Sequence, residues 1–323
     1  MSYEFVKSSF SSLTGQWKNL QSNSVSNIIF STPEWSAVYW QCFNEGYAEL
    51  LGEIRDDARS IGIAPLMTQG ETAFFIGGGD ICDYLDFIIH KGYEREFFKA
   101  LLHDLPSHGI KKLDLAPLRA DSSVMTTLAD LAKSTGHKVT TVPVDVSPYV
   151  NLPSTWEDYL KSLDTKQRHE LRRKMRRLNE MGAVDYRVKN AASPENIEIF
   201  FKLFRESRED KAQFLSPRME NYFRLLLNSM SGAGYLRLNM LDYNNKPIAA
   251  TICFDYNHEM LLYNSGFDRE YSWLSAGLVS KAMAIEDSIK LGRAKFDFLK
   301  GGEDYKYHLG GLDLPVYRCT III

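Results

Sequence analysis

The pattern of hydrophobic and polar positions predicts a strand-rich plan in the second half of the chain. Alternating or β-branched runs are separated by Asn-containing turns, which is typical of strands joined by hairpins. A longer run has apolar residues at near-helical spacing and ends at Gly292, as helices commonly do. The predicted elements are strands at 235–242, 248–256 and 259–267, a helix at 272–292, and strands at 293–299 and 314–323.

The first half repeats this order. Its predicted elements are strands at 48–57, 60–67 and 72–80, a helix at 94–106 and a strand at 111–118. The matching strand positions Ile61 and Asp114 are 53 residues apart, and Ile248 and Asp297 are 49 apart. We interpret this as a weak internal duplication; the alternative is two domains that share a generic α+β order.

A Pro- and Ser-containing segment at 142–155 suits a link between the two halves. The sequence therefore predicts two domains, 1–148 and 149–323, in a mixed α/β (α+β) fold. With 323 residues, 44% hydrophobic and 24% charged, the chain is expected to bury an ordinary globular core.

The composition excludes several classes of protein. No run approaches the roughly 18 apolar residues of a membrane span, and the N-terminal segment lacks the pattern of a signal peptide. The four cysteines are scattered without CxxC spacing, which predicts neither a zinc site nor a disulfide framework. We therefore expect a reducing, cytoplasmic setting and no metal.

Charge is distributed unevenly along the chain. Residues 1–150 carry 12 Lys and Arg against 18 Asp and Glu, whereas residues 151–323 carry 26 against 23. Seven of these cations lie between Lys166 and Arg177, within a predicted helix at 155–182 that Thr155 caps. Such crowding favours a binding edge for phosphate, nucleic acid or an anionic lipid head group. The alternative is a solvated face balanced by neighbouring carboxylates.

The stretch 297–310, DFLKGGEDYKYHLG, concentrates titratable side chains directly after a predicted strand. Together with 30–40, 62–66, 77–87, the basic helix and 263–278, it resembles GNAT-like acyltransferases of the CelD type, relatives of the FemAB peptidyltransferases. The resemblance runs from about residue 30 to the C-terminus. It implies two GNAT-like (acyl-CoA N-acyltransferase) domains in tandem, of which the N-terminal one is degenerate.

That resemblance implies transfer of an acyl group to a primary amine, often in bacterial cell-envelope or exopolysaccharide assembly. The thioester donor would lie where the strands at 259–267 and 293–299 separate. Its diphosphate would meet the start of the following helix at Ser275, Ala276 and Gly277, where free N–H groups favour an anion. A backbone N–H near Ser265 or Gly266 would hold the thioester carbonyl.

The family's usual Gln/Arg-x-x-Gly-x-Gly/Ala loop is absent from this sequence. Acyl-CoA is therefore the expected co-substrate, and aminoacyl-tRNA, which some FemAB-like relatives use, is the alternative. Both donors are polyanions that a basic helix suits.

The resemblance also suggests roles for the C-terminal stretch. Tyr305 would protonate the departing thiolate, and Lys306 would hold a substrate anion or the oxyanion. Glu303 or Asp304 would accept the amine proton, directly or through water. Each has a structural alternative: Tyr305 as packing, Lys306 as the partner of a nearby acid, and Glu303 as a helix cap. Asp297 is expected to orient the loop.

Two further groups are candidates for substrate binding. Asp83, Tyr84 and Asp86 lie in a glycine-rich loop of the first half and are expected to face an acceptor amine; the alternative is a capped loop. Arg172 and Arg173 of the basic helix are expected to contact an anionic part of the substrate.

The expected partner is a small-molecule or glycan-precursor amine, with no specific DNA readout. A peripheral membrane contact through residues 166–177 is a second expectation. The rival from another class is a non-catalytic module that binds an anionic polymer or a membrane surface.

Overall fold

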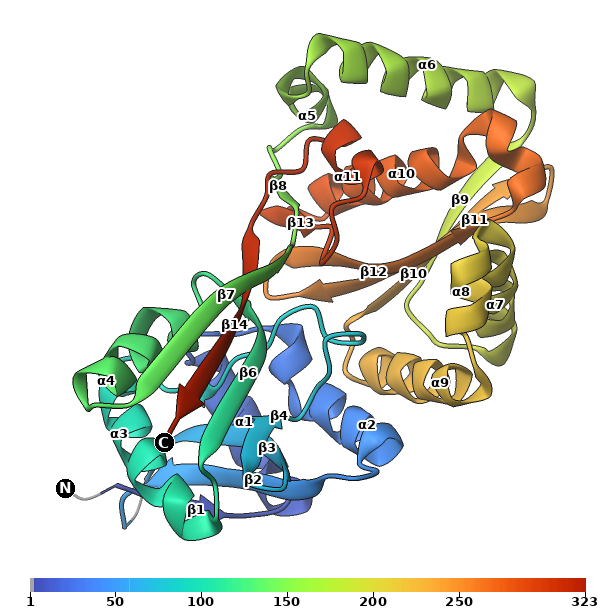
Figure 1. Cartoon of the computed structure of the whole chain (residues 1–323). Coiled ribbons are helices and arrows are strands. Elements are labelled where there is room, and N and C mark those ends of the chain that lie inside the picture. The colour runs from blue at the N-terminus through green and yellow to red at the C-terminus, as the bar shows by residue number, and fades with distance from the viewer. Residues whose placement is uncertain (1–2, 58) are drawn as a thin grey trace. The chain divides into compact units, whose positions relative to one another are not determined.

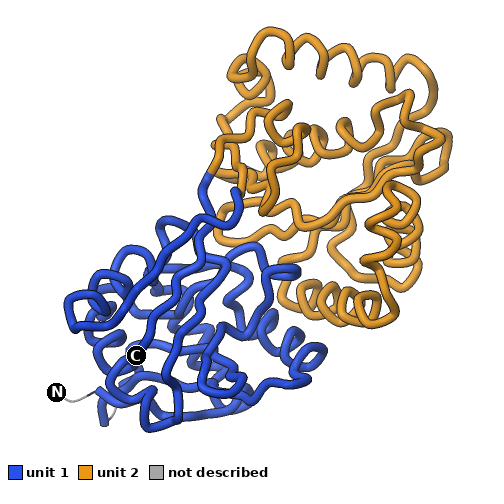
Figure 2. The backbone as a smooth tube through the Cα atoms, in the orientation of Figure 1, with its two compact units in different colours: residues 1–146, 314–323 blue, residues 147–313 orange. Residues whose placement is uncertain are grey.

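A computed structural model describes residues 3–57 and 59–323, which divide into two compact units. Unit 1 comprises Met1–Val146 and Leu314–Ile323, and unit 2 comprises Ser147–Asp313 (Figure 2). The chain therefore passes from unit 1 into unit 2 and returns for its last ten residues.

Unit 1 is built on an eight-stranded sheet in the order β1-β2-β3-β4-β6-β14-β7, with β5 paired to β3. Helices and short turns connect the strands (Figure 1). The elements are β1 (Glu4–Lys7), α1 (Phe10–Ser22), α2 (Pro33–Phe43), β2 (Ala48–Arg55), β3 (Ser60–Gln69), β4 (Thr72–Phe75), β5 (Ile88–Ile89), α3 (Glu94–Asp104), β6 (Lys112–Arg119), α4 (Ala129–Ser134), β7 (Lys138–Val146) and β14 (Pro315–Ile322).

Unit 2 holds a six-stranded sheet in the order β8-β13-β12-β11-β10-β9. Its elements are β8 (Tyr149–Asn151), α5 (Trp156–Ser162), α6 (Thr165–Met181), β9 (Val184–Lys189), α7 (Pro194–Ser207), α8 (Glu209–Phe214), α9 (Pro217–Gly232), β10 (Leu236–Tyr243), β11 (Lys246–Tyr256), β12 (Glu259–Phe267), η4 (Arg269–Leu274), α10 (Ala276–Lys290), β13 (Lys295–Asp297) and α11 (Asp304–His308).

The two units repeat one arrangement of strands. In unit 1, antiparallel β2, β3 and β4 are followed by α3, and β6 then pairs with β4 in parallel. In unit 2, antiparallel β10, β11 and β12 are followed by α10, and β13 then pairs with β12 in parallel. The strands matched by the sequence duplication, β3 with β11 and β6 with β13, occupy equivalent places in the two sheets.

The last strand requires a correction to the predicted plan. The sequence places 314–323 at the end of the second domain, but β14 inserts between β6 and β7 of unit 1. It pairs antiparallel with both, and Val316, Cys319 and Ile321 are fully buried there. An alternating apolar pattern shows that a strand is half buried, but it does not identify the sheet that accepts it.

The basic segment also differs from the single helix predicted over 155–182. Thr155 caps α5 as expected, accepting from the Asp158 N–H at 3.1 Å, but the helix ends at Ser162. Leu163 is extended (φ −70°, ψ 149°) and buried, and Asp164 caps a new helix, α6, by accepting from the Gln167 N–H. Burial of the Leu163 side chain accounts for the break.

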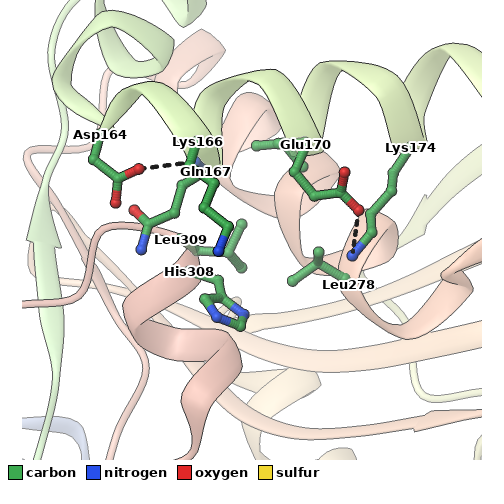
Figure 3. A pocket seen from close by; sticks show the side chains of 9 residues that line it. Asp164, Lys166, Gln167, Glu170, Lys174, Leu278, His308 and Leu309 are labelled. Atoms are coloured by element: carbon green, nitrogen blue, oxygen red, sulfur yellow. Dashed lines mark hydrogen bonds and ion pairs between the residues drawn. The ribbon is translucent and has the colours of Figure 1, made fainter.

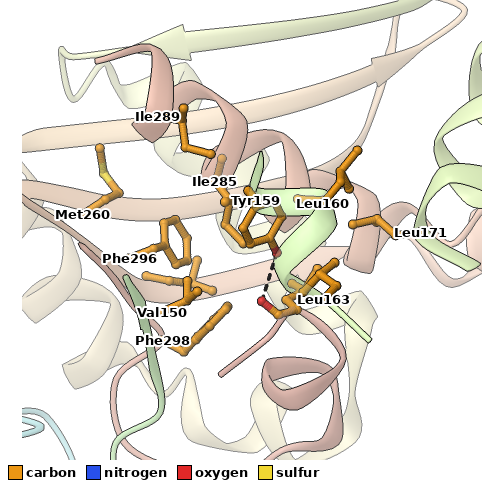
Figure 4. Close-up of a cluster of buried hydrophobic side chains, with 14 of the residues drawn as sticks. Val150, Tyr159, Leu160, Leu163, Leu171, Met260, Ile285, Ile289, Phe296 and Phe298 are labelled. Carbon is orange, nitrogen blue, oxygen red and sulfur yellow. Dashed lines mark hydrogen bonds between the residues drawn. The ribbon is translucent and has the colours of Figure 1, made fainter. Parts of the chain in front are cut away.

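The core of unit 2 around α5 fixes the position of the C-terminal stretch (Figure 4). Tyr159 is fully buried among apolar side chains from β8, β13 and α10, and its hydroxyl donates to the Leu309 carbonyl at 2.9 Å. Phe296 and Phe298 flank the end of β13 in the same cluster, and Tyr305 packs against it. The core therefore anchors α11 at the end of β13.

The helices of unit 2 pack on both faces of its sheet. A Cβ on Gly266 of β12 would meet the α7 backbone at Phe204, whereas the Phe267 ring lies against Gly277 of α10. Because successive strand residues point to opposite faces, α7 and α10 cover opposite sides, as Figure 1 also shows. Within the described residues, no helix has the length and apolar character needed to cross a bilayer.

Candidate active site

The strands β12 and β13 pair over a short length and then separate. Their parallel register covers Glu259–Leu261 against Lys295–Asp297. The remainder of β12, up to Phe267, pairs with β11 but with no other strand among the described residues. The register with β11 shifts next to Tyr263, which indicates a bulge at the point where β13 leaves. The predicted separation of these strands is therefore present.

The loop that leaves β13 is folded around two buried side chains. The Asp297 carboxylate, 1% exposed, accepts from the Leu299 N–H at 2.8 Å and from the Ser147 hydroxyl at 3.2 Å. Leu299 has φ 61°, a left-handed conformation that is strained for a residue with a side chain. Asp297 thus orients the loop, as expected.

Lys306 is the second of these side chains, and its position corrects the role expected for it. Its Nζ donates to the carbonyls of Leu299, Lys300 and Gly301 at 2.8–2.9 Å and lies 2.9 Å from the Glu303 carboxylate. An ammonium has three N–H donors, and the side chain is 2% exposed. Lys306 therefore holds the loop together and has no donor left for a substrate anion.

Glu303 precedes α11, but its side chain makes no capping hydrogen bond. Partial burial acts to raise the pKa of Glu303, yet attraction to Lys306 and their hydrogen bond outweigh it and hold the pKa below its ordinary value. The carboxylate is 47% exposed and so can reach a bound molecule. A lowered pKa makes it a weaker base.

Tyr305 lies between the core of unit 2 and an ammonium group. Its ring contacts Phe298 edge-on, with centroids 6.4 Å apart, and packs against the buried cluster around Tyr159. Lys281 Nζ stands 4.6 Å from the ring centroid on its face. The Tyr305 ring therefore packs against the core, as the structural alternative expected.

The residues predicted to hold the donor gather at the open end of β12. Ser275 adopts φ 57° just before α10 and makes no side-chain cap, Ala276 is fully buried, and Gly277 is pressed against the Phe267 ring. A Cβ on Gly277 would approach Phe267 to 2.9 Å, so the glycine is required for packing.

Ser265 and Gly266 lie on the unpaired edge of β12, and both also make contacts with α7 or α8. A Cβ on Gly266 would lie 2.4 Å from the Phe204 nitrogen, which makes glycine necessary where α7 crosses the strand. The Ser265 carbonyl accepts from Lys211 Nζ of α8 at 2.6 Å.

Two lysines at this end were not singled out by the sequence pattern. Lys281, on the second turn of α10, is 6% exposed, and its Nζ donates to the Gly277 carbonyl at 2.7 Å. Burial lowers the pKa of Lys281 to about 7, and burial lowers the pKa of Lys211 to about 8. A lysine inside the apolar face of a predicted helix was the available signal for Lys281.

A cavity of about 440 Å³ lies between α6, the first turn of α10 and α11 (Figure 3). Leu171, Leu278 and Leu309 form its apolar part. Its polar side chains are Asp164, Lys166, Gln167, Glu170, Lys174 and His308. Lys174 pairs with Glu170 at 3.5 Å. The cavity therefore combines an apolar floor with cationic groups next to the start of α10.

The predicted arginines of the basic helix have acidic partners. Arg172 pairs with Glu157 at 2.6 Å, and Arg173 contacts both carboxylate oxygens of Glu170 at 2.7 and 2.9 Å. The neighbouring carboxylates thus balance part of this face, as the alternative interpretation expected. Both guanidinium groups remain about half exposed.

The acidic loop of unit 1 is largely turned inward, which corrects the expectation that its side chains face an acceptor amine. Tyr84 is 1% exposed and packs edge-on against Phe30. Asp86 is also 1% exposed and accepts from the Ser123 N–H at 2.7 Å and its hydroxyl at 2.6 Å. Only Asp83 of the three is partly exposed. Burial of a bonded aspartate is invisible in the sequence pattern.

No group of three or more His, Cys, Asp or Glu side chains suited to a metal ion occurs in 3–57 or 59–323.

The comparisons with known proteins agree with this geometry. Residues 165–307, within unit 2, match the family model described as an acetyltransferase (GNAT) domain. No curated protein matches the sequence.

Several solved structures share the fold along nearly the whole chain. FemX aligns with a TM-score of 0.69 at 9% identity, over 98% of this chain and 97% of that one. The C-terminal domain of a putative lysylphosphatidylglycerol synthetase from Agrobacterium fabrum gives 0.60 at 10%, over 98% and 92%. A tandem GNAT protein from the clavulanic acid biosynthesis pathway gives 0.55 at 13%, over 100% and 99%. The predicted mixed α/β fold of two GNAT-like domains is confirmed.

Proposed function

We propose that this chain moves an acyl group from acyl-CoA to a primary amine. Its residues 165–307 match an acetyltransferase (GNAT) domain, and its fold is similar to those of FemX and a tandem GNAT protein. The observation that carries the proposal is the separation of β12 from β13 beyond Leu261 and Asp297. It leaves an unpaired strand edge beside the start of α10 and Tyr305, where an extended thioester can lie.

The reaction is a direct transfer. The neutral amine nitrogen attacks the thioester carbonyl carbon, and a tetrahedral intermediate forms with its negative charge on the former carbonyl oxygen. A backbone N–H of the β12 edge stabilises that oxygen. The C–S bond then breaks, Tyr305 gives its proton to the departing sulfur, and the new amide loses the proton of the former amine to Glu303 or water.

The cavity between α6 and α10 suits the anionic end of the donor. Lys166, Lys174 and His308 stand around it, and the first turn of α10 borders it at Leu278. Lys166 and Lys174 replace the missing glycine-rich loop as a source of positive charge. Basic side chains from α6 thereby become part of the donor site in this proposal.

Replacing Tyr305 with Phe tests the assignment. The ring packing against Phe298 and Lys281 is kept, while the proton donor is removed. We expect kcat to fall on the order of 100-fold with little change in the KM for acyl-CoA.

Tyr307→Phe is the matched control, because its hydroxyl donates to Asp313 from the same short helix. It should retain activity. Equal turnover of wild type and Tyr305→Phe would remove Tyr305 from the mechanism.

The alternative donor is aminoacyl-tRNA. The likeness to FemX and the exposed cations of α6 favour it as the second candidate. Thermal stability measured with coenzyme A and with tRNA separates the two, since a ligand at 100 times its Kd adds roughly 2.7 kcal/mol. We expect coenzyme A to stabilise the protein and tRNA to have no effect. The reverse result would establish the tRNA-dependent ligase.

The pathway is part of the same proposal. The names of FemX and lysylphosphatidylglycerol synthetase favour a role in cell-envelope biosynthesis, with a glycan or lipid precursor as the amine. Contact between residues 166–177 and an anionic membrane surface is compatible with such a substrate.

A further inference from the structure

Two ammonium groups, that of buried Lys281 and that of partly buried Lys211, lie near the unpaired edge of β12 on opposite faces of the sheet. Lys281 belongs to α10, whose Gly277 lies against Phe267. Lys211 belongs to α8, which follows α7, and α7 crosses the strand at Gly266 on the other face. The carbonyl that accepts from Lys211 is that of Ser265, directly before these two positions. The end of β12 around Ser265–Phe267 therefore has an amine near it on each face of the sheet.

Neither amine has a carboxylate partner among the described residues. Lys281 Nζ bonds the Gly277 carbonyl and lies on the Tyr305 ring, and Lys211 Nζ bonds the Ser265 carbonyl and lies 4.9 Å from the Phe204 ring centroid. An ammonium has three donors. Each group therefore has two N–H bonds that no described protein acceptor takes.

The local charge is not balanced. The carboxylates that act on these amines already have other partners. Glu303 lies 2.9 Å from Lys306, and Asp210, next to Lys211 in the chain, pairs with Arg208 at 2.7 Å. Burial is the main cause that lowers the pKa of Lys281, and the positive charge of Lys211 adds to it. Burying unpaired cations is costly, and an anion between them would remove much of that cost.

We propose that Lys211 and Lys281 form a subsite for a carboxylate of the substrate, close to the reacting thioester. This inference rests on the proposed acyl transfer and names its substrate class: either the acyl group is that of a dicarboxylic acid, or the acceptor amine carries a carboxylate, as an amino acid does. The Lys281 ammonium touches the ring of Tyr305, so the carboxylate binds beside the group assigned to protonate the sulfur. The diphosphate of the donor is assigned elsewhere, to the cavity lined by Lys166 and Lys174.

Calorimetric titration tests whether the carboxylate belongs to the acyl group of the donor. The probes are coenzyme A, acetyl-CoA and succinyl-CoA, added to wild type, Lys281→Met and Lys211→Met. Lys290→Met, an exposed lysine at the end of α10, is the control. If the carboxylate belongs to the acyl group, wild type binds succinyl-CoA at least 10-fold more tightly than acetyl-CoA, and both Met variants lose that preference. Binding then takes up protons above pH 7, because the carboxylate raises the pKa of both amines.

Steady-state kinetics of acetyl transfer from acetyl-CoA to matched amines tests whether the carboxylate belongs to the acceptor. L-lysine is compared with cadaverine and L-alanine with ethylamine, which differ by the carboxylate alone. If the carboxylate belongs to the acceptor, the amino acid has the higher kcat/KM in wild type. The Met variants then raise the KM of the amino acid about 10-fold more than they raise the KM of the plain amine.

Three results would overturn the inference. One is the absence of a carboxylate preference in both experiments. Another is an equal loss of affinity for all three coenzyme A probes in the Met variants, which would place the donor diphosphate on these amines. The third is retention of the preference in both Met variants.

The proposed function fails separately, if wild type binds none of the coenzyme A probes. Lys211 and Lys281 lie on different helices. If one Met variant fails to fold, the other variant still tests the inference. Far-UV circular dichroism and the melting temperature show which variants remain folded.

Discussion

At the scale of single residues, several charged side chains near the candidate site form hydrogen bonds to the backbone of the loop after β13. Lys306 gathers three loop carbonyls, and Asp297 fixes the strained Leu299 next to them. These hydrogen bonds fix the conformation of the loop that carries Tyr305 and Glu303. Preorganisation of this kind lets a side chain act without reorganisation during the reaction.

Asp86 gives a residue-scale prediction about pH. Burial raises the pKa of Asp86 to about 6 despite its hydrogen bonds from Ser123. The folded state therefore favours the protonated form, so the contribution of this group to stability is complete below about pH 4 and is lost as pH rises through about 6.

Relative to Asp86→Asn, wild type should lose up to about 3 kcal/mol of unfolding free energy between pH 4 and 7. Urea unfolding at a series of pH values measures this difference. Asp80→Asn, in an exposed position of the same loop, is the control. A difference that does not change with pH would contradict the assignment.

At the scale of elements, the site depends on how closely α7 approaches β12. Gly266 permits this approach, since an added Cβ would lie 2.4 Å from the Phe204 nitrogen and 2.5 Å from the Leu203 carbonyl carbon. Backbone atoms on both sides cannot move independently of their helix and strand. The same approach places α8, and with it Lys211, at the open edge of the strand.

Gly266→Ala should therefore destabilise the protein by roughly 2–3 kcal/mol, the cost of overpacking against backbone. It should also weaken acyl-CoA binding by moving the β12 edge. Gly232→Ala at the end of α9, where an added Cβ meets nothing within 4 Å, should change stability by less than about 1 kcal/mol. Denaturant midpoints measure both variants, and equal midpoints for the two would refute the packing argument.

At the scale of the whole molecule, the sheet of unit 1 includes the last strand of the chain, β14. Because β14 lies between β6 and β7, its hydrogen bonds to both neighbours complete that sheet. Folding of unit 1 therefore requires contacts between residues far apart in the sequence, from Pro315 with Val146, 169 positions apart, to Ile322 with Lys112, 210 positions apart. Such contacts are slow to form compared with local ones.

Deletion of residues 314–323 should expose β6 and β7 and unfold much of unit 1 while unit 2 keeps its structure. Hydrogen exchange followed by mass spectrometry would then show lost protection at 112–119 and 138–146, but not at 236–267. Ile322→Ser, whose side chain is 45% exposed, should leave exchange unchanged. Preserved protection of 138–146 in the deletion variant would show that β7 does not depend on β14.

The sequence by itself determined the elements whose signals are local. Alternation and turn residues gave β12 at Glu259–Phe267, and the capping pattern gave the start of α5 at Thr155. The resemblance carried by the C-terminal stretch gave the tandem fold. These features depend on neighbouring residues, so a one-dimensional pattern contains them.

Only the tertiary structure decided where long side chains and the last strand go. The same local pattern allows Lys306 to face a substrate or a loop, Asp86 to face solvent or Ser123, and β14 to join either sheet. Contacts between residues distant in sequence choose among these options, through burial and the requirement that buried polar groups be bonded. The convergence of Lys211 and Lys281 on one strand edge arises for the same reason.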